Sequence, residues 1–108
     1  MSLLIHIRYM GENDNARKFA KDMIDKKIVD RIRKQKGNLQ YDYYLPLEED
    51  GSILLIDRWE NQEALDTHHK SSMMEDIIEL REKYDLRMIV ERFESIEDNL
   101  DDIKYIRK

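Results

Sequence analysis

The fold is decided by residues 53–71, whose sequence is ILLIDRWENQEALDTHHKS. The stretch begins with four apolar residues, as a buried strand does, and then carries Trp59, the only tryptophan of the chain. Asn61 follows and can cap a helix. One face of the helix expected after it carries Ala64, Leu65 and His68. A strand therefore passes directly into a helix, and we expect a pocket at this junction.

The composition of the chain indicates one folded domain. Its 108 residues are 41% hydrophobic and 40% charged, and the formal net charge is -5. A chain of this length buries only part of its unfolded surface, so a single sheet with helices on one face is about what it can build. Because so many charged positions compete with a small core, we expect a second copy to cover the other face of the sheet, which makes a homodimer.

Several classes of protein are disfavoured by the same numbers. The sequence contains no cysteine, which excludes disulfides and thiolate chemistry and gives no sign of an oxidising compartment. The apolar runs are too short to cross a bilayer and the N-terminus does not look like a signal peptide, so we expect a cytoplasmic protein without a membrane partner. The basic residues of segment 26–36 are mixed with acidic ones near a helix end, and the net charge is negative, so we expect no nucleic-acid partner.

The first third of the chain predicts a strand followed by a long helix. Apolar and polar residues alternate over residues 3–10, as they do in a strand with one buried face. Turn residues occupy positions 11–15, and a helical period follows them as far as Gly37, which can end a helix in the left-handed conformation. The apolar face of this helix drifts at residues 26–27, which predicts a bend or break there.

The rest of the chain predicts three strands and a second helical region. A strand over 38–45 and the strand of the quoted stretch flank a charged turn at 48–51, so they should pair as an antiparallel hairpin. Apolar spacing over 73–84 predicts a second helical segment, and alternation over 86–93 predicts the last strand. The order is βαββαβ, which is the α+β, ferredoxin-like arrangement with an antiparallel sheet.

Side chains that suit a ligand pocket cluster on two of these strands. Tyr41 and Tyr43 share one strand face, where aromatic residues serve either packing or the lining of a cavity for a planar ligand. Asp57 shares its strand face with Trp59, and a carboxylate on an otherwise apolar face needs a partner or water.

Three short motifs carry a resemblance to a known family. They are GNLQYD at residues 37–42, RWE at residues 58–60, and ALDTH at residues 64–68 followed by Ser71. In this order and spacing they resemble the antibiotic biosynthesis monooxygenase superfamily, which includes quinol monooxygenase-like proteins. The resemblance runs to Phe93, which divides the chain into a domain at 1–94 and a charged C-terminal extension at 95–108. It implies a dimeric α+β barrel, in which two ferredoxin-like protomers turn their sheets toward each other and each keeps its own cavity.

The resemblance also implies a function and a set of site residues. Some members oxidise phenolic or quinol compounds without metal or flavin, so the expected activity is that of a monooxygenase with no cofactor, acting on a small aromatic substrate. His68, Trp59 and Asn38 stand at the matched positions and are the candidate catalytic residues, because such donors can stabilise a phenolate or enolate. A tryptophan at the position of Trp59 is more often a core residue than a catalytic one, and Asn38 can be a cap at the strand entry after Gly37. The candidate substrate-binding residues are Tyr41, Tyr43 and Asp57.

Two other functions stay open. A dimeric module that binds a small aromatic ligand without turnover would need the same pocket. A haem-degrading monooxygenase is disfavoured because Ile77 and Ile78 stand where that branch is expected to carry its iron ligand. A metal site is disfavoured as well, since His68 and His69 project about 100° apart around a helix and cannot easily share one ion.

Overall fold

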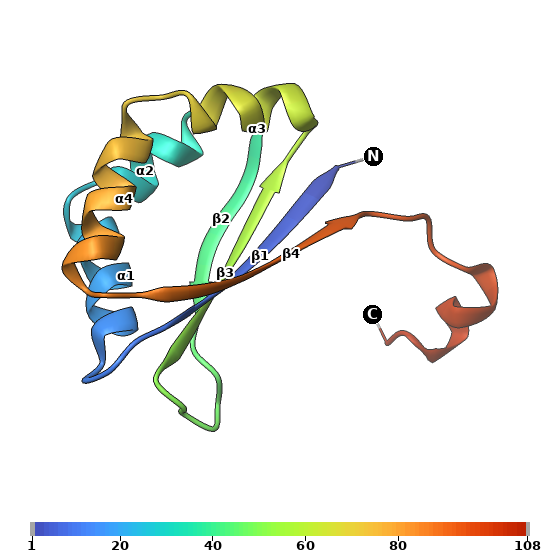
Figure 1. The fold of residues 1–108 in the computed structure, drawn as a ribbon. Coiled ribbons are helices and arrows are strands. Elements are labelled where there is room, and N and C mark those ends of the chain that lie inside the picture. The colour runs from blue at the N-terminus through green and yellow to red at the C-terminus, as the bar shows by residue number, and fades with distance from the viewer. Residues whose placement is uncertain (1, 108) are drawn as a thin grey trace.

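Four strands form one antiparallel sheet in the order β2-β3-β1-β4, and α1 to α4 lie on one of its faces (Figure 1). This computed structural model describes residues 2–107, so Met1 and Lys108, the outer ends of the predicted domain and extension, lie outside it. The α+β, ferredoxin-like order is confirmed. The elements are β1 (Leu3–Met10), α1 (Asn15–Asp25), α2 (Ile28–Arg33), β2 (Asn38–Tyr44), β3 (Ser52–Trp59), α3 (Gln62–His69), α4 (Met73–Lys83), β4 (Arg87–Glu94) and a 3₁₀ helix, η1 (Leu100–Tyr105).

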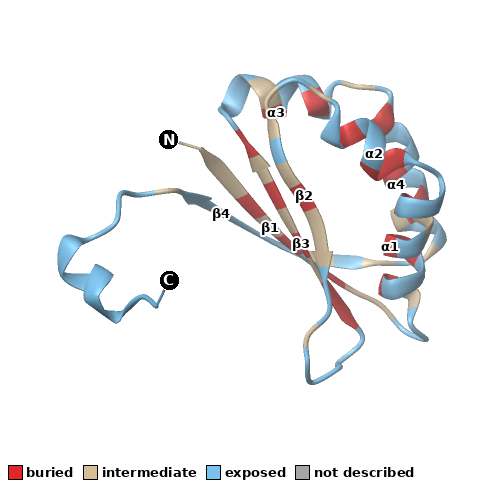
Figure 2. Ribbon diagram, turned by 180° about the vertical axis from the view of Figure 1, so that it is seen from behind, coloured by how far each residue is buried: buried red, intermediate tan, exposed pale blue. Residues whose placement is uncertain are grey.

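The two faces of the sheet differ in what covers them. Buried residues gather where the central strands meet the helices, whereas β4 and the chain beyond it are exposed (Figure 2). Ile5 pairs with Asp57 across β1 and β3, and both side chains lie on the helix-covered face. The opposite face carries the other set of alternating residues and has no covering layer within residues 2–107.

The predicted long helix is broken where its apolar face drifts. α1 ends at Asp25 and α2 begins at Ile28, and Lys27 between them adopts a left-handed backbone with φ 65°. The predicted break at residues 26–27 is therefore confirmed. The helix was expected to continue to Gly37, but α2 ends at Arg33, and Gly37 instead brings the following turn against α3.

A bulge changes the face assignments at the start of β2. The register shifts between Asn38 and Gln40, so that Asn38 lies opposite Trp59 and Tyr41 lies opposite Asp57. Regular alternation had put Leu39 on the same face as Tyr41, but the bulge removes it from that face and leaves it exposed. The bulge therefore places Asn38, at the start of β2, on the same helix-covered face as Tyr41.

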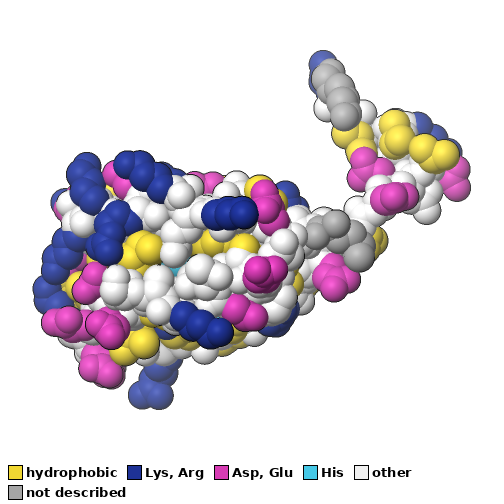
Figure 3. All heavy atoms as spheres, turned by 90° about the horizontal axis from the view of Figure 1, so that it is seen from above, with side chains coloured by type: hydrophobic (Ala, Val, Ile, Leu, Met, Phe, Trp, Pro, Cys, Tyr) yellow, Lys and Arg dark blue, Asp and Glu magenta, His cyan; other side chains and the backbone are white. Residues whose placement is uncertain are grey.

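The chain beyond β4 leaves the body of the molecule. It runs away from the sheet and ends in η1, and its apolar side chains are visible on the surface of this projection (Figures 1 and 3). These exposed apolar residues are Ile96, Leu100, Ile103, Tyr105 and Ile106.

Candidate active site

A cavity of about 200 Å³ lies between the helix-covered face of the sheet and helices α3 and α4. Most of its wall is aliphatic, from Ile, Leu, Met and Val side chains. Its polar residues come from five elements, β2, β3, α3, α4 and β4, and they are Tyr41, Asp57, His68, His69, Arg81 and Arg92. An apolar hollow with a few convergent polar groups is the usual form of a small-molecule site.

Burial and a stacking contact hold His68 in place on this wall. α3 starts at its cap Asn61, whose Oδ1 accepts a hydrogen bond from the Ala64 N–H at 2.9 Å, and its inner face then presents Leu65 and His68. The His68 side chain is only 3% exposed and stacks on the Trp59 indole, with ring centroids 4.9 Å apart. Burial, with smaller contributions from His69 and Arg81, lowers the pKa of His68 to about 4. The imidazole is therefore neutral at neutral pH.

Gln35 holds the other side of the His68 ring. Its Oε1 lies 2.7 Å from His68 Nδ1. Gln35 belongs to the turn between α2 and β2. Nothing in the sequence singles it out, because a lone glutamine among basic residues resembles an ordinary exposed position. Only the packing of this turn against α3 reveals its contact with the site.

Asp57 is a buried acid on the cavity wall. It is 4% exposed, and its Oδ1 has no hydrogen-bond partner within residues 2–107. Burial raises the pKa of Asp57 to about 7, and the nearby Trp59 N–H offsets part of the rise although the two groups do not meet hydrogen-bond geometry. At neutral pH this carboxyl group is thus divided between its protonated and ionised forms.

Arg81 and Tyr9 form a second polar pair that sequence reasoning missed. Arg81 Nη2 donates to the Tyr9 hydroxyl at 2.9 Å, and the guanidinium carbon lies 5.5 Å from the centre of the Tyr9 ring. Burial raises the pKa of Tyr9, while the Arg81 charge partly opposes this rise. One signal was available, since Arg81 follows Ile77 by four residues and so continues the apolar face of α4.

The six predicted site residues do not all lie on the cavity wall. His68, Tyr41 and Asp57 do. Trp59 is fully buried behind the His68 ring, and its indole N–H has no partner in the part of the chain that is described. Asn38 Nδ2 donates to the carbonyl oxygens of Gln40 at 3.3 Å and Arg58 at 3.4 Å, which ties it to the bulge.

Tyr43 is the remaining member of that set. It packs edge-on against Tyr41 with ring centroids 5.9 Å apart, and its buried hydroxyl lacks a partner among residues 2–107. Burial raises the pKa of Tyr43, so its hydroxyl stays protonated. Its side chain supports the wall residue Tyr41 and borders a separate surface hollow beside α1.

The family model for the antibiotic biosynthesis monooxygenases matches residues 2–80. The chain belongs to this family. The match spans the first three strands and nearly all of α4, and so includes most of the residues that build the cavity. No curated protein sequence matches the chain.

Solved structures share the fold of this family member over nearly its full length. A candidate antibiotic biosynthesis monooxygenase from Deinococcus radiodurans has a TM-score of 0.76 at 18% identity, covering 90% of this chain and 95% of its own. Rv0793 from Mycobacterium tuberculosis has a TM-score of 0.71 at 22% identity, covering 91% and 98%. SnoaB from Streptomyces nogalater, a cofactor-independent oxygenase, has a TM-score of 0.74 at 10% identity, covering 90% and 95%. At these identities the likeness establishes the fold alone.

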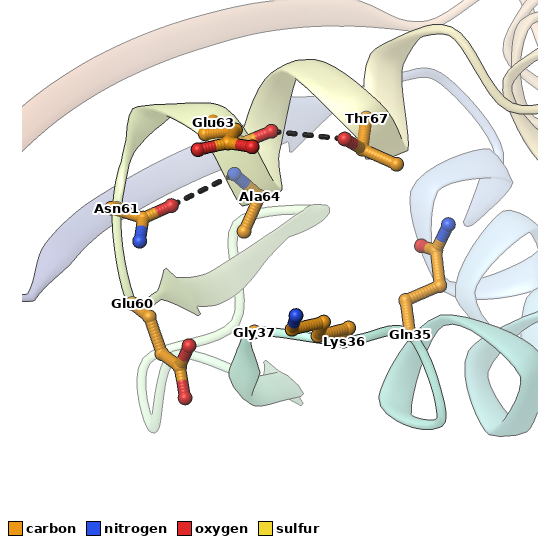
Figure 4. Close-up of a pocket in the computed structure, with 8 residues that line it drawn as sticks. All are labelled: Gln35, Lys36, Gly37, Glu60, Asn61, Glu63, Ala64 and Thr67. Carbon is orange, nitrogen blue, oxygen red and sulfur yellow. Dashed lines mark hydrogen bonds between the residues drawn. The ribbon is translucent and has the colours of Figure 1, made fainter.

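This monooxygenase-family chain has a second hollow on the outer side of α3. It is a groove of about 290 Å³ between α3 and the turn that joins α2 to β2, and Gln35 extends from that turn toward α3 (Figure 4). The groove mixes Lys36 with the carboxylates of Glu60 and Glu63. Gln35 thus borders the groove while its amide oxygen contacts His68 on the wall of the inner cavity.

Two further findings concern the described residues only. Within residues 2–107, no three His, Cys, Asp or Glu side chains are grouped so that they could hold a metal ion. Over the same residues, every helix is too short or too polar to span a membrane.

Proposed function

We propose that this protein is a cofactor-independent monooxygenase that oxidises a small phenol or quinol. The observation that carries the proposal is the largely apolar cavity whose wall brings together a neutral imidazole, a buried carboxyl group and a guanidinium. His68 supplies the imidazole, Asp57 the carboxyl group and Arg81 the guanidinium. Membership of the monooxygenase family supports the reaction type, and the chemistry of the wall supports the substrate class.

The size of the cavity supports a substrate with one or two rings. A cavity of 150 Å³ in another protein holds benzene, and this one measures about 200 Å³. The aliphatic wall favours a planar apolar body, while the polar groups can orient a hydroxyl group on it.

The proposed mechanism begins with a proton transfer. His68 is neutral at neutral pH and can take the proton of the substrate hydroxyl as a general base. An imidazole with a pKa of about 4 is a weak base, so this transfer requires that the Arg81 charge lowers the pKa of that hydroxyl. The resulting phenolate is electron-rich enough to pass an electron to O₂, so the substrate itself is the reductant. Arg81, held by Tyr9, lies on the same wall and stabilises the negative charge that develops there.

The oxygen atoms and electrons then balance without another reactant. A carbon–oxygen bond forms at an unsubstituted ring carbon ortho or para to the hydroxyl group, giving a peroxide. The oxygen–oxygen bond breaks as that carbon loses its hydrogen, which yields a quinone and one water. One atom of O₂ enters the product and the other leaves as water, and the substrate supplies all four electrons. Asp57, with a pKa of about 7, can donate the proton that the departing oxygen needs.

The test is oxygen uptake by purified protein given one-ring and two-ring phenols and quinols. We expect uptake that stops without substrate, incorporation of one ¹⁸O atom from ¹⁸O₂ into the product, and a loss of about 10²- to 10⁴-fold in kcat in His68→Asn. Asp66→Asn is the matched control, because Asp66 lies on the same helix as His68 but is exposed and lines neither the cavity nor the outer groove. Tight binding of these compounds without oxygen uptake would refute the oxygenase and support a binding module.

We also propose that the protein acts as a homodimer. The uncovered face of the sheet carries apolar side chains that a second copy would shield from water, and an exposed patch of this kind on a small protein marks an interface. A second copy suits it because a sheet face can pack on its own two-fold image. The apolar residues of this face are Leu4, Leu54, Ile56, Ile89 and Phe93.

A further inference from the structure

The hydrogen bond between Gln35 and His68 has a direction. The amide oxygen Oε1 of Gln35 lies 2.7 Å from His68 Nδ1, and because an amide oxygen only accepts hydrogen bonds, this contact favours a proton on Nδ1. The second nitrogen, Nε2, then keeps its lone pair. We propose that Gln35 is a positioning residue that fixes His68 as the Nδ1–H tautomer and leaves Nε2 as a proton acceptor toward the cavity.

The backbone around Gln35 is built to hold this contact. The Gln35 N–H donates to the Ile32 carbonyl at 3.0 Å, and the Gln35 carbonyl accepts from the Asn38 N–H at 3.1 Å, which closes the turn. Gly37 lies so near α3 that a Cβ atom there would stand 2.5 Å from the Cβ of Ala64. Ala64 lies one helical turn before His68 on the same face of α3, so this close approach sets the separation between the turn and the imidazole.

The Nε2 atom of His68 is free to meet a ligand. The ring makes its single hydrogen bond through Nδ1, and Nε2 is not among the fully buried polar atoms that lack a partner within residues 2–107. His68 lines the cavity, and in our proposal Nε2 faces that space. A substrate hydroxyl in that space can therefore approach the nitrogen that carries the lone pair.

No other acceptor among residues 2–107 competes for Nδ1. The titratable groups that line the cavity around the imidazole are Asp57 on β3, His69 on α3, Arg81 on α4 and Arg92 on β4. None of them hydrogen-bonds to His68. The tautomer therefore depends on Gln35, and loss of the amide would let the proton move to Nε2 and block the base.

This inference rests on the proposed function only in its use of Nε2 as a base, because the tautomer can be measured without substrate. The measurement is the long-range ¹H–¹⁵N NMR spectrum of the histidine rings at pH 7.5. The signals of His68 are those that vanish in His68→Asn. We expect the wild-type protein to show the Nδ1–H tautomer and Gln35→Leu to show a mixture of both tautomers.

Two variants separate the role of the amide oxygen from general damage to the turn. Gln35→Glu keeps an acceptor oxygen, so it should retain the Nδ1–H tautomer and raise the pKa of His68 by about 1 to 3 units through its negative charge. Lys36→Met changes the neighbouring exposed side chain and should alter neither quantity. In the oxygen-uptake assay, Gln35→Leu should lower kcat by about 10- to 100-fold with little change in KM.

Either of two NMR results overturns the inference. An Nε2–H tautomer in the wild-type protein would mean that the amide nitrogen faces the ring. An unchanged Nδ1–H tautomer in Gln35→Leu would mean that the surroundings fix the ring without Gln35. If the expected tautomers are found but no phenol or quinol supports oxygen uptake, the proposed oxygenase fails and the positioning of His68 by Gln35 stands.

Discussion

The imidazole of His68 stacks on the indole of Trp59, with ring centroids 4.9 Å apart and an angle of 28° between the ring planes. The contact joins the end of β3 to the last turn of α3. Trp59 therefore covers one face of the His68 ring. Gln35 contacts the edge of the ring through Nδ1. The two contacts together define where the proposed base lies.

Trp59→Phe tests whether the stacking of Trp59 on His68 matters for turnover. Phenylalanine leaves space beside the imidazole but removes a buried N–H that has no partner among residues 2–107, so the two effects on stability partly cancel. We expect the free energy of unfolding to fall by no more than about 2 kcal/mol, as measured by denaturation in urea. Oxygen uptake should fall by about tenfold because the His68 ring is less well held. Unchanged uptake would remove Trp59 from the mechanism.

Much of the fold was predictable from periodicity, and part of the site was predictable from the junction of β3 and α3. Three features could be recognised because each depends only on residues close together in the sequence. They are the apolar run of β3, the Asn61 cap and the face of α3 that carries His68. Gln35 and Arg81 were missed because their roles depend on packing between elements distant in sequence. Gln35 reaches a residue 33 positions away, and Arg81 one 72 positions away.

The bulge at Leu39 limited the prediction in another way. Strict alternation assigned Asn38 to the face opposite Tyr41, whereas one extra residue puts both on the side of the helices. Nothing in the composition of β2 marks this irregularity. A single unpaired residue therefore decides which face of the sheet the start of a strand joins.

Gly37→Ala should destabilise the protein more than Gly51→Ala does. Both glycines have a left-handed backbone, with φ 88° and 81°, so alanine carries a similar conformational cost at each. At Gly37 the new Cβ would also stand 2.5 Å from the Cβ of Ala64, whereas the nearest atom at Gly51 is 3.6 Å away. We expect a loss of about 1 kcal/mol in Gly51→Ala and at least twice that in Gly37→Ala. Equal losses in chemical denaturation would show that the turn does not press on α3.

Asp57→Asn should change the way stability depends on pH. The pKa of Asp57 is raised from 3.8 to about 7, so the folded state favours the protonated acid. The contribution of Asp57 to the free energy of unfolding is therefore fully present below pH 4 and is lost as the pH rises toward 7. Above pH 7 the buried carboxylate costs up to about 4 kcal/mol. Asparagine cannot ionise, so the variant should be more stable than the wild-type protein at pH 8, with the difference shrinking as the pH falls to 5.

His68 makes the free energy of unfolding change with pH in the opposite direction to Asp57. Asp57→Asn should make this dependence visible. The pKa of His68 is lowered from 6.5 to about 4, so the unfolded state takes up a proton more readily and stability rises between pH 4 and 6.5. In the wild-type protein, the gain in stability from His68 and the loss of stability from Asp57 largely cancel between pH 4 and 6.5. Asp57→Asn should keep only the gain. Urea denaturation at half-unit pH steps measures both curves, and parallel curves would contradict the raised pKa of Asp57.

Ile89→Glu should separate the proposed homodimer into monomers. Ile89 lies on β4 on the uncovered face of the sheet and is 49% exposed in the single chain. A second copy on that face would bury the new carboxylate without a partner, which costs several kcal/mol. Ile24→Glu is the matched control, because Ile24 is 53% exposed but lies on α1, away from that face. Light scattering after gel filtration should give twice the mass of the chain for the wild-type protein and Ile24→Glu, and the mass of one chain for Ile89→Glu. A wild-type monomer, or a dimer that survives Ile89→Glu, would mean that this face is not where two copies meet.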